Sequence, residues 1–298
     1  MNKLLKYGGY LVLLFLLLMA LDKMSDGCLY NCKGDIKITH NAGFFSCCSV
    51  RLSEIIDFIN SNKRLPDNVD SSEQFEIYKK TNEKNKDITF DYFENYNIVK
   101  DVNIIHPINY HQTHQFKNYS DLDYKCITPL IKKYFSPSTN VNEILNNLKK
   151  KYNIIYDNTL AVYYRGTDKI EETPLASFDD FYKQIIKITD INKNIKILIQ
   201  TDTTKFIDYI NSKNLKNIII INENKTSYTN KGIHNEQSKN TNYYDIFNFL
   251  STLLIISKCK YIICNSGNCS IWIMFYRGNN KNVIQNLNGT WYNSVFKI

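Results

Sequence analysis

Apolar strands and helices alternate regularly between residues 158 and 276, which limits the chain to few folds. Four short runs rich in isoleucine, leucine and valine are separated by segments with helical spacing. The predicted strands are residues 158–165, 194–200, 217–222 and 260–264. The predicted helices are residues 177–188, 203–211, 243–257 and 268–276. Nearly continuous apolar strands joined by helices indicate an α/β fold, in which helices cover both faces of a parallel sheet.

The first half of the chain is less regular. The elements predicted there are a strand at 35–40, a glycine-containing loop at 41–46, and helices at 49–62, 121–135 and 141–152. Residues 66–120 are rich in Asn, Asp and Tyr and show no clear pattern. A length of 298 residues allows two domains, and we place the boundary between them near residue 150.

An apolar run at residues 10–21 follows two basic residues, Lys3 and Lys6. The run is shorter than the roughly 20 residues of a spanning helix, and the basic residues favour a cytoplasmic N-terminus. We therefore predict an uncleaved signal anchor at residues 1–24 and a single-pass type II membrane protein with its body in an ER- or Golgi-like lumen. The alternatives are a cleaved signal peptide followed by secretion, and a buried core helix.

Cysteines, histidines and sequons add little to this picture. The eight cysteines contain no C-x-x-C pair, so a zinc ribbon is not predicted. In an oxidising lumen Cys28 and Cys32 could form disulfides, with each other or elsewhere. A solvated loop is favoured over a metal site at His106, His111 and His114, and no metal site is predicted. The N-x-S/T sequons at Asn118, Asn224, Asn268 and Asn288 support a secretory, glycosylated protein only weakly, because asparagine is frequent.

Several functional classes lose support. Lysine and arginine number 37 against 29 acidic residues, but the excess lysine is spread over helices, so nucleic-acid binding is not predicted. The sequence contains no dinucleotide G-x-G-x-x-G, no Walker loop and no G-x-S-x-G, which disfavours hydride transfer, P-loop ATP hydrolysis and serine hydrolysis. No D-x-D within an apolar stretch marks a metal-dependent sugar transferase.

Ligands of parallel α/β sheets lie beyond the carboxyl ends of the strands, which directs attention to residues 165–176, 200–203 and 264–270. In the first of these loops Arg165 could grip a phosphate with its planar fork of donors. Asp168 could orient that arginine, and Lys169 adds a second cation. A surface cluster of salt bridges is the alternative.

The loop at residues 264–270 runs from a strand into a helix. Gly267 allows the backbone to approach a ligand closely, and Ser266, Asn268 and Ser270 offer polar groups beside the free helix N–H donors, which suits a pyrophosphate. Plain capping of the helix by Asn265 or Ser266 is the alternative. In the second loop Asp202 could hold a ribose or a base, or could cap the helix that follows.

Taken together, these motifs resemble a known family. Residues 163–169 read Tyr-Tyr-Arg-Gly-Thr-Asp-Lys and resemble the His-x-Arg-x-x-Asp element of the GDP-fucose-dependent α1,6-, α1,2- and protein O-fucosyltransferases. The strand at residues 261–264 and its Asn-Ser-Gly-Asn loop resemble the later donor-binding motif of that family. Residues 199–202 resemble an intermediate strand that ends in Thr-Asp.

The resemblance implies a GT-B architecture, with a cleft between two Rossmann-like lobes that follow a single N-terminal apolar helix. The acceptor-side lobe would be residues 25–152, and the nucleotide-sugar-binding lobe residues 153–298. The loop at residues 41–46 would face the acceptor and the cleft through Asn41, Gly43 and Phe44.

The resemblance also implies inverting transfer of fucose from GDP-fucose to a glycan or protein acceptor, without a metal or other cofactor. Arg165 would neutralise the leaving β-phosphate, and Asp168 would be the second catalytic residue. The implied donor-binding residues are Lys169, Asp202, Asp245, Asn265, Ser266, Gly267, Asn268 and Ser270.

The chain departs from the family pattern at three places. The leading histidine is Tyr163, the second basic residue of the α1,6 branch is Gly166, and a family aspartate falls at Thr252. No general base is assigned, and the candidates are Glu171, Glu172 and Asp245. Two rival functions therefore stay open: a GT-B transferase with another nucleotide sugar, and a catalytically inactive, membrane-anchored carbohydrate-binding or scaffold protein.

Overall fold

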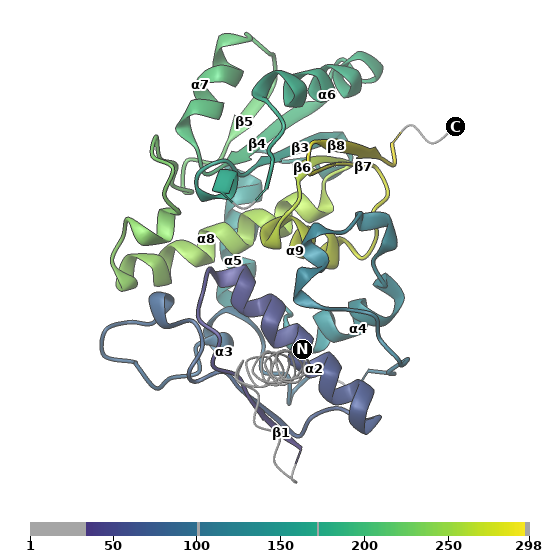
Figure 1. Ribbon diagram of the computed structural model, residues 1–298. Coiled ribbons are helices and arrows are strands. Elements are labelled where there is room, and N and C mark those ends of the chain that lie inside the picture. The colour runs from purple at the N-terminus through teal and green to yellow at the C-terminus, as the bar shows by residue number, and fades with distance from the viewer. Residues whose placement is uncertain (1–33, 100–101, 172, 296–298) are drawn as a thin grey trace, which may run out of the picture.

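The computed structural model describes residues 34–99, 102–171 and 173–295, and it confirms the predicted parallel-dominated α/β fold (Figure 1). A six-stranded sheet has the order β5-β4-β3-β6-β7-β8. Its strands are β3 (Thr159–Tyr164), β4 (Lys196–Thr201), β5 (Ile218–Ile220), β6 (Tyr261–Asn265), β7 (Val283–Leu287) and β8 (Thr290–Asn293). All neighbouring pairs are parallel except β7 and β8, which are antiparallel.

The strands that come after β3 in the sequence lie on both sides of it in the sheet. From β3 it proceeds to β4 and β5 on one side, and it then returns to place β6 on the other side of β3. The strand order therefore reverses between β3 and β6, and the loops that follow these two strands diverge. Arg165 directly follows β3, and Ser266 directly follows β6.

Two buried clusters lie on opposite faces of the sheet. Every residue of β3 is buried, and successive side chains point to opposite faces. Leu160 and Val162 belong to the cluster that contains the buried residues of α6 (Phe178–Ile191) and α7 (Thr204–Ser212). Ala161 and Tyr163 belong to the cluster that contains those of α8 and α9. These two helices, α8 (Lys239–Lys258) and α9 (Asn268–Arg277), cover the other face (Figure 1).

The N-terminal part has a small two-stranded sheet in the described residues, and the Rossmann-like lobe at residues 25–152 stays a prediction. Within the described residues it holds one parallel pair, β1 (Asp35–Lys37) and β2 (Asn68–Asp70), joined by α2 (Phe44–Asn62). The other elements before β3 are η1 (Glu76–Tyr78), α3 (Thr89–Tyr92), η2 (Gln112–Phe116), η3 (Tyr119–Asp121), α4 (Tyr124–Tyr134), α5 (Thr139–Lys151) and η4 (Tyr156–Asn158). Residues 71–99 and 102–123 are polar and lack further apolar runs, so they form short helical turns rather than strands.

Helix α2 begins at Phe44, five residues before the predicted start at residue 49. Phe44 and Phe45 are the cause, because both side chains are buried and pack inward as the first residues of a helix. Helix α8 likewise starts earlier than predicted, at Lys239, because Ser238 accepts a hydrogen bond from the backbone N–H of Thr241 and caps it. The two remaining short elements are η5 (Asp168–Glu171) and η6 (Ile233–Asn235).

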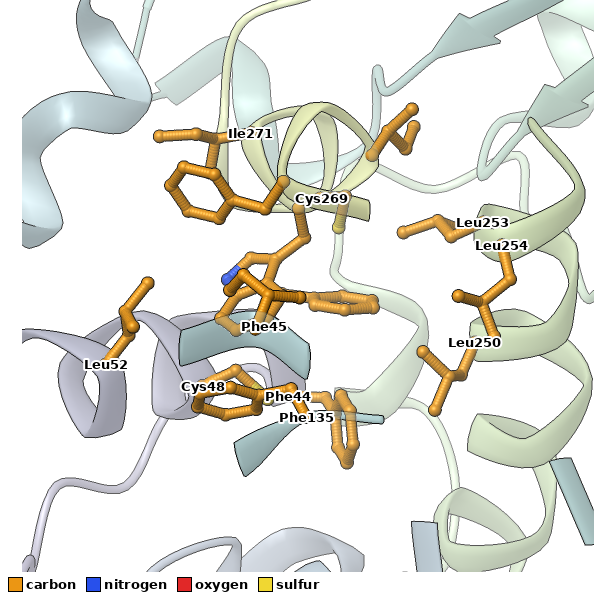
Figure 2. Packing of buried hydrophobic residues seen from close by; sticks show 14 of the residues in the cluster. Phe44, Phe45, Cys48, Leu52, Phe135, Leu250, Leu253, Leu254, Cys269 and Ile271 are labelled. Carbon is orange, nitrogen blue, oxygen red and sulfur yellow. The ribbon is translucent and has the colours of Figure 1, made fainter. Parts of the chain in front are cut away.

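Helices α2 and α9 meet at a joint centred on Trp272, whose side chain is 0% exposed. Its ring lies 4.7 Å from that of Phe135 and 5.9 Å from that of Phe45. The indole N–H donates to the Ser49 hydroxyl at 2.9 Å, and this hydroxyl donates to Asn268 at 2.9 Å. Figure 2 shows Phe45 and Phe135 in the packed space between these helices. One buried cluster therefore crosses the predicted boundary near residue 150, and the two-domain division stays a prediction.

Among the helices of the described segments, none is both long and apolar enough to cross a membrane. The apolar run at residues 10–21 and the anchor predicted at residues 1–24 lie outside the described residues. Cys28 and Cys32 lie outside them as well, and the six cysteines that are described are free thiols.

We predict that Trp272→Ala lowers the free energy of unfolding by about 3–5 kcal/mol, as expected for removal of a fully buried tryptophan. Urea denaturation of the purified protein measures this change. The control is Phe90→Ala, because the Phe90 side chain is 38% exposed. Equal losses of unfolding free energy in the two variants would show that the contacts of Trp272 between α2 and α9 stabilise the protein no more than an exposed side chain does.

Candidate functional site

A cavity of about 460 Å³ lies at the carboxyl ends of β3, β4 and β6, facing the N-terminus of α2. Eleven predicted site residues line it: Gly43, Phe44, Arg165, Asp168, Lys169, Asp202, Asp245, Ser266, Gly267, Asn268 and Ser270. The structure therefore brings together residues from segments that are far apart in the sequence. Asn41 and Asn265 are the two predicted site residues that do not line the cavity.

Arg165 is the central cation of the cavity. One terminal nitrogen donates to both carboxylate oxygens of Asp168, at 2.8 and 3.0 Å, and the other donates to the Cys269 sulfur at 3.4 Å. The arginine Nε lies 3.6 Å from Asp202. The side chains of Arg165 and Asp168 are each 26% exposed, so this is no freely solvated surface pair. Burial by itself raises the pKa of Asp168, but the adjacent Arg165 outweighs burial and holds that pKa below its ordinary value.

The backbone of Arg165 is held as firmly as its side chain. Asn265 accepts a hydrogen bond from the Arg165 N–H at 3.1 Å and donates to its carbonyl oxygen at 2.7 Å. Asp202 accepts from the Gly166 N–H at 2.8 Å and from the Thr167 hydroxyl at 2.7 Å. Asn265 therefore acts on the site through Arg165. Asp202 braces the loop after β3 instead of capping α7, whose N-cap residue is Thr203.

The N-terminus of α9 opens onto the same cavity. Gly267 is its N-cap residue, and no side chain caps the helix. Capping by Asn265 or Ser266 is therefore wrong, and the Ser266 hydroxyl donates instead to the Asn286 carbonyl. Gly267 has a φ of 149°, and a Cβ placed on it would lie 3.0 Å from Cε and 3.3 Å from Nζ of Lys169. The glycine thus lets the lysine lie directly against the start of the helix.

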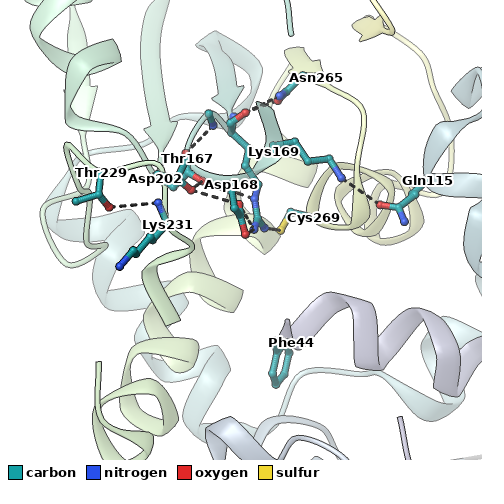
Figure 3. A network of polar contacts seen from close by, with 12 residues as sticks. Phe44, Gln115, Thr167, Asp168, Lys169, Asp202, Thr229, Lys231, Asn265 and Cys269 are labelled. Atoms are coloured by element: carbon teal, nitrogen blue, oxygen red, sulfur yellow. Dashed lines mark hydrogen bonds and ion pairs between the residues drawn. The ribbon is translucent and has the colours of Figure 1, made fainter. Parts of the chain in front are cut away.

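Lys169 is only 4% exposed, although it carries a charge. Its Nζ lies 3.5 Å from Gln115 Oε1 and 4.9 Å from the centre of the Phe116 ring. Figure 3 shows Lys169 extending toward Gln115, away from Asp168. A second cation is therefore held beside the free N–H groups of α9.

These groups suit an anion with more than one phosphate. One cavity is bordered by Arg165, by Lys169 and by the N-terminus of α9. Helix N-termini bind phosphate through free N–H groups and the helix dipole. Arginine adds bidentate hydrogen bonds to the phosphate oxygens. Chemically, the arrangement can hold a diphosphate and stabilise negative charge that develops on it.

The glycine-containing loop contributes differently from the prediction. Asn41 is exposed and holds the loop in shape, since it donates to the carbonyls of Thr39 and Glu73 and accepts from the Glu76 N–H. Phe44 reaches the cavity, but its side chain is 3% exposed and packs mainly in an aromatic cluster. Gly43 lines the cavity as predicted.

The acidic candidates for a general base are either paired or have side chains that are not described. Asp245 pairs with Lys225 at 2.9 Å. The side chains of Glu171 and Glu172 are not among those described. Within the described ranges no three His, Cys, Asp or Glu side chains are grouped so that they could hold a metal ion. His111 instead accepts from the Thr113 N–H, and His114 is buried beside Tyr110.

Sequence reasoning missed the segment after β5, which supplies Asn224, Lys225 and His234 to the cavity. The Asn224 amide nitrogen donates to Gln200 Oε1 and Thr252 Oγ1, each at 2.8 Å. Its Oδ1 is buried without a hydrogen-bond partner in the described structure. Asn224 also lines a recess of about 180 Å³ beside the cavity. The strand-end rule, applied to β5 as well, would have directed attention to these residues.

No protein-family model and no curated protein matches this chain. Among solved structures it is similar to NodZ α-1,6-fucosyltransferase co-crystallized with GDP, with 12% identity and a TM-score of 0.38 over 55% of this chain and 49% of that chain. It is similar to fucosyltransferase NodZ from Bradyrhizobium, with 12% identity and a TM-score of 0.38 over 55% and 50%. A mutant of Arabidopsis thaliana FUT1 in complex with GDP is 11% identical, with a TM-score of 0.34 over 54% and 36%.

This chain thus spans about half the length of the NodZ structures, and less of FUT1.

We predict that Gly267→Ala weakens the binding of inorganic pyrophosphate by about tenfold or more, a loss of about 1.4 kcal/mol. The added methyl group would displace Lys169 from the start of α9. Titration calorimetry measures the affinity. Gly289→Ala is a matched control, because Gly289 also has a positive φ of 82° but has no atom within 4 Å of the added Cβ. Equal affinities in the two variants would exclude Lys169 and Gly267 from anion binding.

We also predict that Asp168→Asn destabilises the protein at neutral pH and that the difference from wild type narrows in acid. The folded-state pKa of Asp168 is lowered. The stability that its charge contributes is therefore present above the unfolded value of about 3.9 and is lost as the pH falls through the folded value. Urea denaturation at pH 7 and pH 3.5 measures the effect. Asp190→Asn is the control, because Asp190 is exposed and forms its ion pair with exposed Lys193. A difference that is constant with pH would contradict the prediction.

Proposed function

We propose that this chain is a glycosyltransferase that uses a nucleoside-diphosphate sugar, with GDP-fucose as the expected donor and a glycan or protein hydroxyl as the acceptor. The observation that carries the proposal is the convergence of Arg165, Lys169 and the N-terminus of α9 on one cavity. That cavity lies where the strand order of the parallel sheet reverses, which is the usual ligand position in such sheets.

In this proposal the diphosphate of the donor lies between Arg165 and the start of α9. When the bond from the sugar to the β-phosphate breaks, negative charge develops on the phosphate oxygens. Positively charged groups and helix N–H donors that are already in place stabilise this charge without reorganisation. Three such protein groups border the cavity, and we propose that they perform this task without a divalent metal ion. Direct attack of the acceptor from the opposite face of the sugar would invert the anomeric centre.

We place the nucleobase in the recess beside the cavity. Gln200, Thr201 and Asn224 line both spaces, so a ligand that extends from the diphosphate can reach the recess. The unpartnered Oδ1 of Asn224 calls for a hydrogen-bond donor, because an unsatisfied buried acceptor costs about 1–3 kcal/mol. Guanine presents two such donors, N1–H and the N2 amine, on one edge. A base with fewer hydrogen-bond donors on that edge would relieve less of this cost.

The acceptor would enter from the side of α2. Gly43, Phe44 and Ser46 line the cavity there, opposite the phosphate-binding groups. The membrane anchor at residues 1–24 and the lumenal location of the body stay predictions from the sequence.

We predict that the protein binds GDP more tightly than UDP or CMP and that it slowly hydrolyses GDP-fucose. Calorimetry measures nucleotide affinity, and release of GDP measures hydrolysis. Arg165→Ala is expected to lower turnover by about 100-fold or more, since it removes donors aimed at the leaving group. Arg165→Lys keeps the positive charge but loses the forked donors, so its turnover should lie between that of wild type and that of Arg165→Ala.

The panel of nucleotides also distinguishes the rival functions. Tighter binding of UDP than of GDP would favour a transferase with another nucleotide sugar. Binding of GDP without any turnover would favour a catalytically inactive binding protein. Absence of binding to all three nucleotides would contradict the donor site itself.

A further inference from the structure

We propose that His234 is the general base of this site, the group that removes the proton from the attacking hydroxyl. The inference rests on the proposed function and goes beyond it, because neither the sequence motifs nor the donor-binding groups assign a base. His234 belongs to η6, in the segment between β5 and α8, and its side chain lines the cavity.

The imidazole of His234 lies between the two walls of the cavity. On the side of α2, its Cε1 lies 3.8 Å from the position that a Cβ on Gly43 would take, and its ring centre is 6.2 Å from that of Tyr78. On the side of the sheet, a Cβ on Gly232 would lie 2.9 Å from His234 Cε1 and 2.7 Å from Asp168 Oδ2. The ring is therefore next to the carboxylate that holds Arg165, and it faces the loop where the acceptor would enter.

Among the acidic side chains that line the cavity in the described part of the chain, each already has a donor or a cation. Asp168 accepts from Arg165, and Asp202 accepts from Gly166 and Thr167. Asp245 pairs with Lys225, and Glu223 accepts from Lys151 and the Tyr152 hydroxyl. A carboxylate held in this way is a poor base, because proton uptake would break an existing charge-assisted contact.

His234 differs from these groups. Within the described structure neither ring nitrogen makes a hydrogen bond or an ion pair, while the backbone is anchored by the Asn242 amide, which donates to the His234 carbonyl at 2.9 Å. The same amide donates to the Ile77 carbonyl at 3.1 Å and so ties the segment to the opposite wall. The ring is thus positioned through its backbone and keeps both nitrogens available for a substrate.

The protonation state of the ring suits a base at neutral pH. The charged and titratable groups that face it are Arg165, Asp168 and Tyr78. Burial and the Arg165 charge lower the pKa of His234, and the opposing effect of Asp168 does not cancel them. The imidazole is therefore neutral at pH 7, and Asp168 can stabilise the imidazolium once the proton has been taken up.

The acceptor oxygen forms a bond to C1 of the sugar, and its proton passes to a ring nitrogen of His234. The bond between C1 and the β-phosphate oxygen breaks, and its electron pair leaves with GDP. Water can take the place of the acceptor, in which case the product is free fucose. The imidazolium then returns its proton to solvent.

The test compares wild type with His234→Gln, using GDP-fucose and water as the substrates. The dissociation constant for GDP should not change, because the ring does not contact the phosphate-binding groups other than through Asp168. Release of GDP at pH 7.5 should fall by about 100-fold or more, the usual contribution of a positioned base. In wild type the rate should fall in acid as His234 becomes protonated, at a pH below the ordinary imidazole value because the pKa of this ring is lowered. This acid limb should be absent from the variant.

Azide provides a second readout, since it is an anion and needs no deprotonation before it attacks C1. GDP release with azide should be similar in wild type and in His234→Gln, because the sugar–phosphate bond still breaks in the same site. His106→Gln is the matched control, since His106 is exposed and does not line the cavity, and it should behave as wild type in every assay.

Two outcomes would overturn the role of His234 alone: hydrolysis by His234→Gln at the wild-type rate, or an unchanged acid limb in that variant. Failure of wild type to bind GDP or to turn over GDP-fucose would instead overturn the proposed function, and the role of His234 with it. The two failures are distinguished by the wild-type measurements alone.

Discussion

The guanidinium of Arg165, held at the place where the strand order reverses, is the constraint on which the rest of the site depends. A partly buried charge is tolerated only when it is paired and hydrogen-bonded. Asp168 supplies the pair, and Asn265 fixes the backbone from the end of β6. Asp202, which follows β4, holds the loop after β3 by accepting hydrogen bonds from Gly166 and Thr167. Three neighbouring strands thus contribute to the direction in which one side chain points.

Helix α9 connects this charge to the packing of the whole molecule. Its N-terminus lies at the cavity beside Lys169, and four residues after Asn268 its Trp272 packs against α2. The Ser49 hydroxyl of α2 connects these two parts of α9, since it donates to Asn268 and accepts from Trp272. The position of α9 is therefore set by the same buried contacts, some of them drawn in Figure 2, that hold the start of α2 beside the cavity. A change in the packing between α2 and α9 would therefore also change the geometry of the site.

The parts that could be predicted are those with a strong local pattern. Strands β3, β4 and β6 are apolar along their length, and α9 follows its loop at a glycine, so their places and the grouping of Arg165 with Gly267 follow from periodicity. The N-terminal part has no such pattern. Its conformation depends on distant partners, such as the Tyr92 hydroxyl that donates to the Tyr243 carbonyl and the Tyr119 N–H that donates to Gln285. Phe44 and Phe45 similarly extend α2 because a core exists to receive them.

The pattern of the sequence was enough to predict the parallel sheet and the cations and glycine that follow the carboxyl ends of its strands. A side chain's place along a strand or helix is a local property, and hydrophobic periodicity records it. Only the tertiary structure decided that Asn224 and His234 join the site, that Asn41 stays outside it, and that Asp245 is already paired. Those outcomes depend on which loops from distant segments meet, and the packing of α2, α8 and α9 settles that.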